Sequence, residues 1–393
     1  MKILSINAGS SSLKFTLYKM PEEEKIVTGQ FERIGIKDGS YKIKVNGEKI
    51  EKKHDLKDHK VAIDILLKEL LDLNIIKDLN EIKAVGHRVV QGADKYDDSV
   101  VITDEVVKNI EKFASLAPLH NPANLIGYQA VKEKLKDAKH VAIFDTAFHQ
   151  SIPKVKYTYP LPLEFLDLKV RKYGFHGTSH KYITEYMQKY LNKDKVNLII
   201  CHIGNGASIT AVKDSKSFDT SMGFTPVSGL MMGTRCGDID ISIAPYIMEE
   251  LNISIEEFMN ICNKKSGLLG ISEYSSDSRD IEAKVEEKDE KAILATDIYA
   301  DKVVNYIANY YFALEGKLDG IVFTAGIGEN SNTTRKRIID KLKCIDIYLD
   351  EKINDETRGS FGIISSTKSK YKVYVVPTDE EVEIARDTYR LTK

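Results

Sequence analysis

The sequence has 393 residues, of which 42% are hydrophobic, so the chain is long enough for two domains with substantial cores. Lysine and arginine total 57 against 59 aspartates and glutamates, and the resulting net charge of −2 gives no electrostatic case for a nucleic-acid or membrane-surface partner. There is no signal-peptide pattern and no run of 18 apolar residues, so we expect a cytoplasmic protein.

The first elements are predicted to be a strand, a glycine-rich turn and a second strand. Lys2–Ile6 is apolar, residues 7–12 read NAGSSS, and Leu13–Tyr18 alternates apolar with polar residues. A backbone that turns through glycine at the end of a buried strand can bring N–H groups close to an anion. By itself such a turn is usually only a hairpin, so a second observation is needed.

Charged strands and a helix are predicted next. Glu24–Asp55 reads as a meander with Asn46-Gly47 as a tight hairpin turn, and apolar residues at helical spacing predict a helix over Asp58–Ile76. Lys83–Val90 is the following strand. Two helices are then expected over Asp104–Ser115 and Pro122–Leu135, the second with Asn121 as its N-cap.

The middle of the chain repeats the opening pattern. His140–Asp145 is a short buried strand that delivers a carboxylate at its end, and Gln150–Leu168 is the candidate crossing between domains. Strand Asn197–His202, the turn Gly204-Asn205-Gly206 and strand Ala207–Lys213 then match the first strand, turn and strand. The match suggests a duplicated unit, with one copy in each half of the chain.

The remaining elements are mostly helical. A third glycine-rich turn, Gly326–Asn330, follows the apolar run Gly320–Thr324, and the final helix, Thr378–Tyr389, is predicted with Thr378 as cap and Glu381 completing a capping box. The other predicted elements are helices ending near Leu191 and spanning about 239–250, 255–262 and 281–313, and a strand over 371–376.

Two arginines stand between glycines. Arg88 (GHRVVQG) and Arg235 (GTRCGD) carry the planar guanidinium that suits a carboxylate or phosphate, although an ordinary salt bridge is the alternative for each. Asp145 is either a strand-end cap or a group that takes a proton or holds Mg²⁺ through water. His176 and His180 lie one helical turn apart but lack a third ligand, so substrate hydrogen bonding is preferred to metal binding.

Several residues could handle a nucleotide and its metal. Lys14 leaves the first glycine turn on a strand, where it either reaches a phosphate or points to water. Asn7 and Glu380 offer the hard oxygen atoms that Mg²⁺ prefers. Residues 277–279 and 326–330 are the candidates for the nucleoside end. His120 is either a turn residue or a site residue. The four cysteines, Cys201, Cys236, Cys262 and Cys344, lack the spacing of a zinc site or a disulfide framework.

Together these motifs resemble the acetate kinase family in order along residues 7 to 388. The matching segments are NAGSSSLKF (7–15), GHRVVQG (86–92), LAPLHNPAN (116–124), FDTAFHQSIP (144–153), RKYGFHGTSH (171–180), HIGNGAS (202–208), GTRCGDID (233–240), FTAGIGENS (323–331) and PTDEEVEIARDT (377–388).

The resemblance implies an α/β, two-domain, actin-like ATPase (ribonuclease H-like) fold with a duplicated βββαβαβα core and a cleft between the domains. The first domain would comprise 1–148 and the returning helix 381–393, on the substrate and Mg²⁺ side. The second, 149–380, would bind nucleotide and mediate a homodimer. The implied partners are acetate or acetyl phosphate and ATP or ADP, with Mg²⁺ (Mn²⁺ as a substitute) as cofactor.

The resemblance also implies a role for each candidate residue. Asn7 and Glu380 would hold the metal; Arg88 would bind the substrate carboxylate; Asp145 would act as acid/base or metal-linked carboxylate; and His176 and Arg235 would stabilise the transferring phosphoryl group. Val90, Leu119, Phe175 and Pro226 would form the acyl pocket. The nucleotide would contact Lys14, His202, Ile203, Gly204, Asn205, Gly206, Asp277, Ser278, Arg279, Gly326, Ile327, Gly328, Glu329 and Asn330.

The expected reaction is direct in-line transfer of the ATP γ-phosphoryl to acetate. Gln91, Ala93 and Asp379 depart from the family's usual His, Gly and Asn, and the first two lie close enough to the acyl pocket to leave chain-length preference open. The alternatives are a propionate or butyrate kinase with the same chemistry and, in a different class, an actin-like polymerising or chaperone ATPase.

Overall fold

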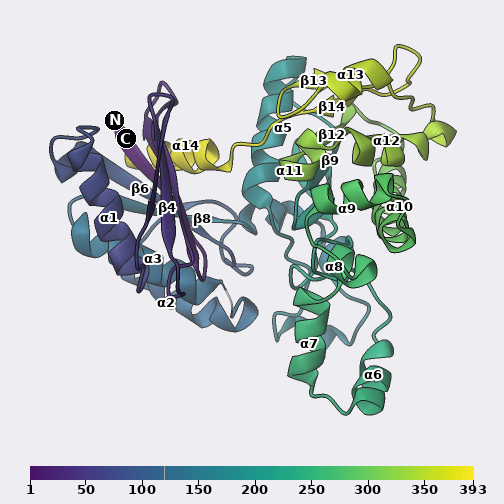
Figure 1. The fold of residues 1–393 in the computed structure, drawn as a ribbon, viewed down its shortest axis with the longest axis horizontal. Helices are drawn as coiled ribbons and strands as arrows, with labels where there is room; N and C mark the ends of the chain where they lie inside the picture. Colours follow the sequence, from purple (N-terminus) through teal and green to yellow (C-terminus); the bar gives the residue numbers. More distant parts are fainter. Residues whose placement is uncertain (119) are drawn as a thin grey trace. The chain divides into compact units, whose positions relative to one another are not determined.

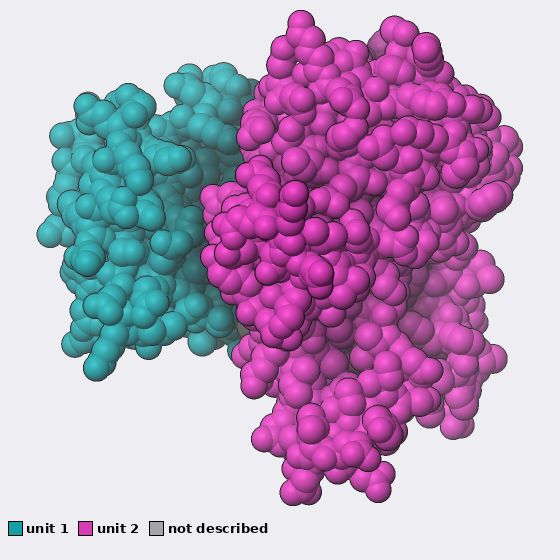
Figure 2. Space-filling view, turned by 45° about the vertical axis from the view of Figure 1, so that its right-hand side comes forward, with its two compact units in different colours: residues 1–150, 379–393 teal, residues 151–378 magenta. Residues whose placement is uncertain are grey.

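The computed structural model describes residues 1–118 and 120–393, so the expected role of Leu119 lies outside the described residues. The chain forms two compact units, coloured separately in Figure 2. Unit 1 contains Met1–Gln150 and Asp379–Lys393, and unit 2 contains Ser151–Thr378. The last helix of the chain therefore belongs with the first unit.

Unit 1 is built on an eight-stranded sheet in the order β5-β4-β3-β2-β1-β6-β8-β7 (Figure 1). Strands β1, β6 and β8 are parallel neighbours, whereas β1 to β5 form an antiparallel meander. The strands are β1 Lys2–Ala8, β2 Ser12–Lys19, β3 Glu24–Glu32, β4 Ser40–Val45, β5 Glu48–Lys53, β6 Ile82–Val89, β7 Val100–Val101 and β8 Lys139–Phe144. The predicted hairpin turn is present, and both Asn46 and Gly47 have positive φ.

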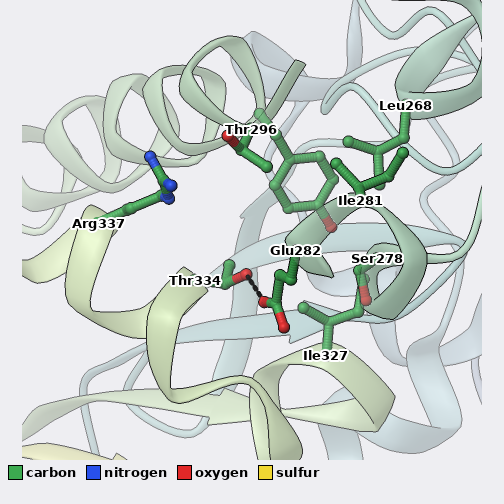
Figure 3. A pocket seen from close by; sticks show the side chains of 9 residues that line it. Leu268, Ser278, Ile281, Glu282, Thr296, Ile327, Thr334 and Arg337 are labelled. Atoms are coloured by element: carbon green, nitrogen blue, oxygen red, sulfur yellow. Dashed lines mark hydrogen bonds between the residues drawn. The ribbon is translucent and has the colours of Figure 1, made fainter. Parts of the chain in front are cut away.

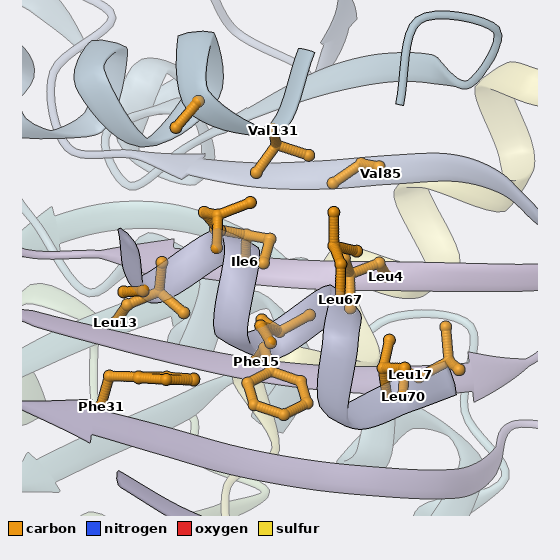
Figure 4. Close-up of a cluster of buried hydrophobic side chains, with 14 of the residues drawn as sticks. Leu4, Ile6, Leu13, Phe15, Leu17, Phe31, Leu67, Leu70, Val85 and Val131 are labelled. Carbon is orange, nitrogen blue, oxygen red and sulfur yellow. The ribbon is translucent and has the colours of Figure 1, made fainter. Parts of the chain in front are cut away.

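Helices cover both faces of this sheet. Leu4, Ile6 and Val85 belong to a core that includes residues of α1 and α3, and Figure 4 shows part of this core. Gly86 faces the other way, because a Cβ there would meet Ile384 and Thr388 of α14. The helices of unit 1 are α1 His59–Asp72, η1 Leu79–Glu81, α2 Asp104–Lys112, η2 Phe113–Leu116, α3 Asn121–Lys134, η3 Ala147–Ser151, which ends across the unit boundary, and α14 Glu380–Thr392.

Unit 2 contains a six-stranded sheet in the order β11-β10-β9-β12-β14-β13. Its strands are β9 Leu198–Ile203, β10 Ala207–Lys213, β11 Lys216–Thr220, β12 Gly320–Thr324, β13 Gly362–Ile363 and β14 Val373–Val375. Its helices are α4 Lys154–Tyr157, η4 Leu163–Leu166, α5 Gly177–Leu191, α6 Ile243–Leu251, α7 Ile255–Lys264, α8 Gly267–Ser272, α9 Ser278–Glu286, α10 Glu290–Ala313, α11 Ala325–Asn330, α12 Asn332–Asp340, η5 Lys343–Ile345 and α13 Glu351–Glu356.

The two sheets repeat one topology, which confirms the predicted duplication and the α/β class. The order β3-β2-β1-β6-β8 in unit 1 corresponds to β11-β10-β9-β12-β14 in unit 2, with three antiparallel strands followed by two parallel ones in each case. In both copies a glycine-containing turn joins the first strand of the meander to the second. The strand–turn–strand segments that match in sequence are therefore also the segments that occupy equivalent positions in the two sheets.

Three local predictions were wrong. The cap of α14 is Asp379, whose side chain accepts from the backbone N–H of Val382, rather than Thr378. The side chain of Asn121 is buried and bonds backbone groups elsewhere, so the N-cap position of α3 falls to His120. Gly326–Asn330 is helical, as part of α11, because the carboxylate of Glu329 accepts from the N–H of Ala325 at the first turn.

Among the described residues, no helix has the length and apolar composition needed to cross a bilayer. All four cysteines are free thiols.

A pair of buried histidines lies in the interior of unit 1. The ring of His140 contacts the carbonyl of Leu135 through Nε2 (3.2 Å) and His87 through Nδ1 (2.9 Å). Because a carbonyl only accepts, the proton of His140 sits on Nε2, and the Nε2–H of His87 donates to His140. Burial lowers the pKa of His140 to about 4, and burial together with His140 lowers the pKa of His87 well below its ordinary value.

We expect this pair to make the protein acid-sensitive. Both folded-state pKa values lie below the unfolded value of about 6.5, so the unfolded chain takes up protons first as the pH falls from about 6.5 towards 4. Denaturant unfolding at pH 5 should show a loss on the order of 2 kcal/mol per histidine relative to pH 7. His140→Gln retains a donor and an acceptor but removes one titration, so its loss should be smaller; an unchanged pH slope would contradict the assignment.

Candidate functional site

In unit 1, three polar side chains stand at the carboxyl ends of neighbouring parallel strands. Asn7 lies near the end of β1, Arg88 near the end of β6, and Asp145 directly follows β8. Strand alternation places all three on the sheet face that α14 covers, since Gly86 on that face packs against α14. In open α/β sheets this edge is where ligands bind.

Arg88 is held by a two-point contact with Asp145. Its Nε donates to Oδ1 at 3.0 Å, and its Nη2 donates to Oδ2. Nη1 lies 3.4 Å from Oδ1 of Asn7. Burial acts to lower the pKa of Arg88, but Asp145 and Glu380 outweigh it and raise the pKa above its ordinary value. The edge formed by Nη1 and Nη2 is the part of the guanidinium that can still clasp a carboxylate end-on.

Further charges gather at the same point. Glu380 is the first residue of α14, and burial, opposed by Arg88 but reinforced by Asp145 and Glu381, raises its pKa to about 7. The exposed Lys14 pairs with Asn7 in the β1–β2 register, so it stands on the same face. Unit 1 thus holds carboxylates beside cations in a space where a further cation would relieve repulsion between Glu380 and its acidic neighbours.

In unit 2, His176 occupies a special backbone position. It precedes α5 with φ of 58°, in the left-handed region that non-glycine residues seldom adopt. Its ring stacks on that of His202 at the end of β9, with centroids 4.2 Å apart. Left-handed backbone at a non-glycine residue clusters at functional sites, and here it directs the ring towards the Gly204–Gly206 turn.

A single hydroxyl links two imidazoles. Ser208 Oγ lies 2.9 Å from His176 Nδ1 and 2.8 Å from His180 Nε2. A serine hydroxyl has one proton, so it donates to one ring and accepts from the other. If Ser208 donates to His176, then the neutral His176 carries its proton on Nε2, the atom that faces the glycine turn. That tautomer can donate to an anion.

Arg235 completes this group of residues. A Cβ added to Gly206 would lie 3.5 Å from Nη1 of Arg235 and 3.6 Å from Nε2 of His176, so the glycine leaves room between the two. Nη1 also lies 3.4 Å from the carbonyl oxygen of Pro226. Among residues 1–118 and 120–393, no carboxylate forms an ion pair with Arg235, and burial lowers its pKa. A half-buried guanidinium in this setting favours an anionic ligand.

The loop that carries Arg235 is pinned by its backbone. The N–H of Leu268 donates to the carbonyl of Met232, the N–H of Ser266 to that of Thr234, and the N–H of Cys236 to that of Cys262. The N–H of Gly233 donates to the carbonyl of Asn205 in the glycine turn. These bonds fix the arginine against the turn.

The two segments expected at the nucleoside line one cavity. Ser278 of α9 and Ile327 of α11 both border a cavity of about 10 Å³, together with Ile281 and Glu282 (Figure 3). Arg279 lies beside them but is highly exposed and pairs with Asp277, which lowers the pKa of that carboxyl to about 2. The amide of Asn330 donates to the carbonyl of Gly326. The fold thus brings sequence-distant candidates together.

Glu329 and Arg335 organise this region from within. The carboxylate of Glu329 turns inward and accepts from the N–H groups of Ala325 and Thr378. Arg335 is fully buried, and its five bonds end on the carbonyls of Gly328, Glu329, Asn354 and Thr357 and the side-chain oxygen of Asn354. Arg335 therefore ties α11 to α13 and to the residue that follows α13. The sequence does not single it out, because it stands in an ordinary charged run, TTRKR.

The residues predicted to form the acyl pocket belong to different units. Val90 is buried in unit 1, whereas Phe175, which is buried, and Pro226, which is half-buried, belong to unit 2. Sequence reasoning also missed Ser179, whose Oγ contacts Nδ1 of His202 at 2.8 Å. Its position between His176 and His180 in the segment HGTSH is the sequence feature that could have indicated it.

Comparison with known proteins gives consistent results along the chain. The Acetokinase family model matches residues 2–386. The acetate kinase of Bacillus subtilis (strain 168) is 52% identical over 395 residues, with 100% of each chain covered. The crystal structure of Porphyromonas gingivalis acetate kinase matches with a TM-score of 0.94 at 43% identity, covering 100% of both chains. A propionate kinase from Francisella tularensis matches with a TM-score of 0.94 at 41% identity, covering 99% of both.

The rigidity of the Arg235 loop leads to a stability prediction. Gly267 has φ of 65°, and a Cβ there would lie 2.1 Å from the carbonyl oxygen of Met232. We expect Gly267→Ala to reduce the free energy of unfolding by about 2–3 kcal/mol, as measured by denaturant titration. Gly326→Ala is the matched control, because nothing lies within 4 Å of its added Cβ. Equal stability of the two variants would show that the loop is loosely held.

Proposed function

Because this chain belongs to the acetokinase family, we propose that it is an acetate kinase that reversibly transfers the γ-phosphoryl group of ATP to acetate, giving acetyl phosphate and ADP. The observation that carries the proposal is the Arg235 guanidinium, half-buried beside His176 and Gly206. It offers positive charge where a transferring phosphoryl group would develop negative charge.

The reaction mainly requires that acetate and the γ-phosphoryl group of ATP are held in the correct positions. An oxygen of acetate forms the new bond to the γ-phosphorus while the bond from that phosphorus to the oxygen retained by ADP breaks. Acetate is already an anion, so no base is needed to activate it, and the barrier comes from bringing two anions together. Arg235 and the Nε2–H of His176 would stabilise the transferring group, with Ser208 setting the His176 tautomer.

Unit 1 would supply the acceptor side. The free edge of Arg88 would clasp the acetate carboxylate, and Asp145 would hold that guanidinium in orientation through its two-point contact. This arrangement favours an orienting role for Asp145 over an acid/base role. Val90, Phe175 and Pro226 would form the apolar wall around the methyl group.

The residues of unit 1 fit a Mg²⁺ ion held by few protein ligands. Asn7 offers an amide oxygen and Glu380 a carboxylate. Burial, reinforced by Asp145 and Glu381, raises the pKa of Glu380, and a bound cation would stabilise the charged form of this carboxylate. When bound with ATP, Mg²⁺ neutralises charge on the phosphates. Mn²⁺ has similar ligand preferences. The Gly204–Gly206 turn and Lys14 would bind the phosphates, and residues 277–279 and 326–330 the nucleoside.

We also propose that the enzyme is a homodimer formed through unit 2. Helix α6 has no buried residue, although it is strongly apolar. Tyr246 and Leu251 in this helix are 66% and 61% exposed, and Ile241, just before it, is 86% exposed. In Figure 1, α6 and α7 project from the rest of unit 2. Exposed apolar side chains clustered in this way favour contact with a second copy.

A hydroxamate assay with acetate, propionate and butyrate tests the reaction. We expect ATP- and Mg²⁺-dependent acyl phosphate formation that is fastest with acetate, since the Bacillus subtilis acetate kinase is 52% identical to this chain and the Francisella tularensis propionate kinase 41%. Sedimentation should show a single species with the mass of a dimer both with and without ATP. Faster turnover of a longer acid would establish the alternative substrate, and ATP-dependent polymers without acyl phosphate would overturn the proposal.

Removing Arg235 should abolish turnover while the fold survives. We expect Arg235→Ala to lower kcat by about 10³-fold or more, because the developing phosphoryl charge loses its guanidinium, and Arg235→Lys to recover only part of it. The control is Arg390→Ala, which removes a surface arginine paired with Asp98. Circular dichroism checks folding, and near-normal turnover of Arg235→Ala would refute the role.

A further inference from the structure

Two buried asparagines lie in the first turn of α3. Asn121 is 0% exposed and Asn124 is 4% exposed. Burying an amide side chain is unfavourable unless its donors and acceptor are hydrogen-bonded, so these residues must be matched to specific partners. The partners are backbone groups that flank the proposed substrate and metal residues.

Just after the end of β6, the side chain of Asn121 bonds a backbone N–H and a backbone carbonyl, as a neighbouring strand would. Its Oδ1 accepts from the N–H of Gln91 at 3.0 Å, and its Nδ2 donates to the carbonyl of the same residue at 3.0 Å. Nδ2 also lies 3.3 Å from the carbonyl of Ile110. Strand β6 ends at Val89, so the side chain of Asn121 supplies hydrogen bonds to the backbone just beyond the last residue that pairs in the sheet.

Asn124 joins the ends of two strands. Its Oδ1 accepts from the N–H of Val90 at 3.1 Å, and its Nδ2 donates to the carbonyl of Ala8 at 2.7 Å. Val90 follows the segment that carries Arg88, and Ala8 directly follows Asn7. One side chain therefore sets the spacing between the end of β1 and the exit of β6.

We propose that Asn121 and Asn124 are positioning residues that set the acetate-binding edge of unit 1. The inference rests on the proposed function of Arg88, Val90 and Asn7. Neither asparagine touches a reacting atom; each acts by fixing the backbone on which those residues stand. Local backbone displacement at Val90 moves the wall of the acyl pocket and, with it, the orientation of the substrate carboxylate on Arg88.

The test compares Michaelis constants for the two substrates. Asn124→Leu has similar volume but leaves the N–H of Val90 and the carbonyl of Ala8 without this partner. We expect it to raise KM for acetate by about tenfold and KM for ATP by much less, because Val90 borders the proposed acyl pocket directly whereas Ala8 only adjoins the proposed metal ligand Asn7. Asn109→Leu is the matched control, because Asn109 on α2 donates to the hydroxyl of Tyr96 and touches neither strand end. We expect both of its Michaelis constants to stay unchanged.

A second variant covers the case in which Asn124→Leu fails to fold. Asn121→Ser removes the bonds to Gln91 and Ile110 with a small polar side chain, and the same selective rise in KM for acetate is expected. Unchanged KM for acetate in folded variants, or an equal rise for both substrates, overturns the proposal, since a general structural role would not separate them. If the unaltered enzyme forms no acetyl phosphate, the proposed function itself has failed.

Discussion

The whole arrangement depends on charged side chains whose charge the protein neutralises only in part. In unit 1, Arg88 is paired with Asp145, but Glu380 remains crowded by other carboxylates. In unit 2, Arg235 is half-buried and has no ion-pair partner among the residues described. Unbalanced charge of this kind is costly in an isolated protein and becomes favourable when ligands of opposite sign bind.

Buried polar side chains hold these charged groups in place. Asn121 and Asn124 extend the sheet ladder past the ends of β1 and β6, and Ser208 connects two imidazoles at the start of β10. Arg335 does the same for α11 by filling its bonds with backbone carbonyls. In each case the hydrogen bonds fix the orientation of their partners as well as their position, because hydrogen bonds are directional.

Much of the fold could be predicted from pattern alone. The strands around the glycine turns were predicted to within a few residues because short apolar runs ended by glycine are distinctive, and the duplication was visible in the same segments. Two of the errors fell at helix ends, and the third was the predicted turn Gly326–Asn330, which is part of helix α11. Asp379 rather than Thr378 caps α14, and Asn121 leaves the capping position, since tertiary partners decided which oxygen met which N–H.

The sequence by itself determined which residue types follow each buried strand: the glycines of the turns, Arg88 and Asp145 near two strand ends, and His176 before a helix. These follow from local periodicity and turn chemistry, which a linear pattern carries. Only the tertiary structure decided that Arg88 meets Asp145, that Ser208 bridges His176 and His180, and that Arg335 is buried. Such contacts join residues far apart in the chain. They depend on sheet register and helix packing, which cannot be read from any short stretch of sequence.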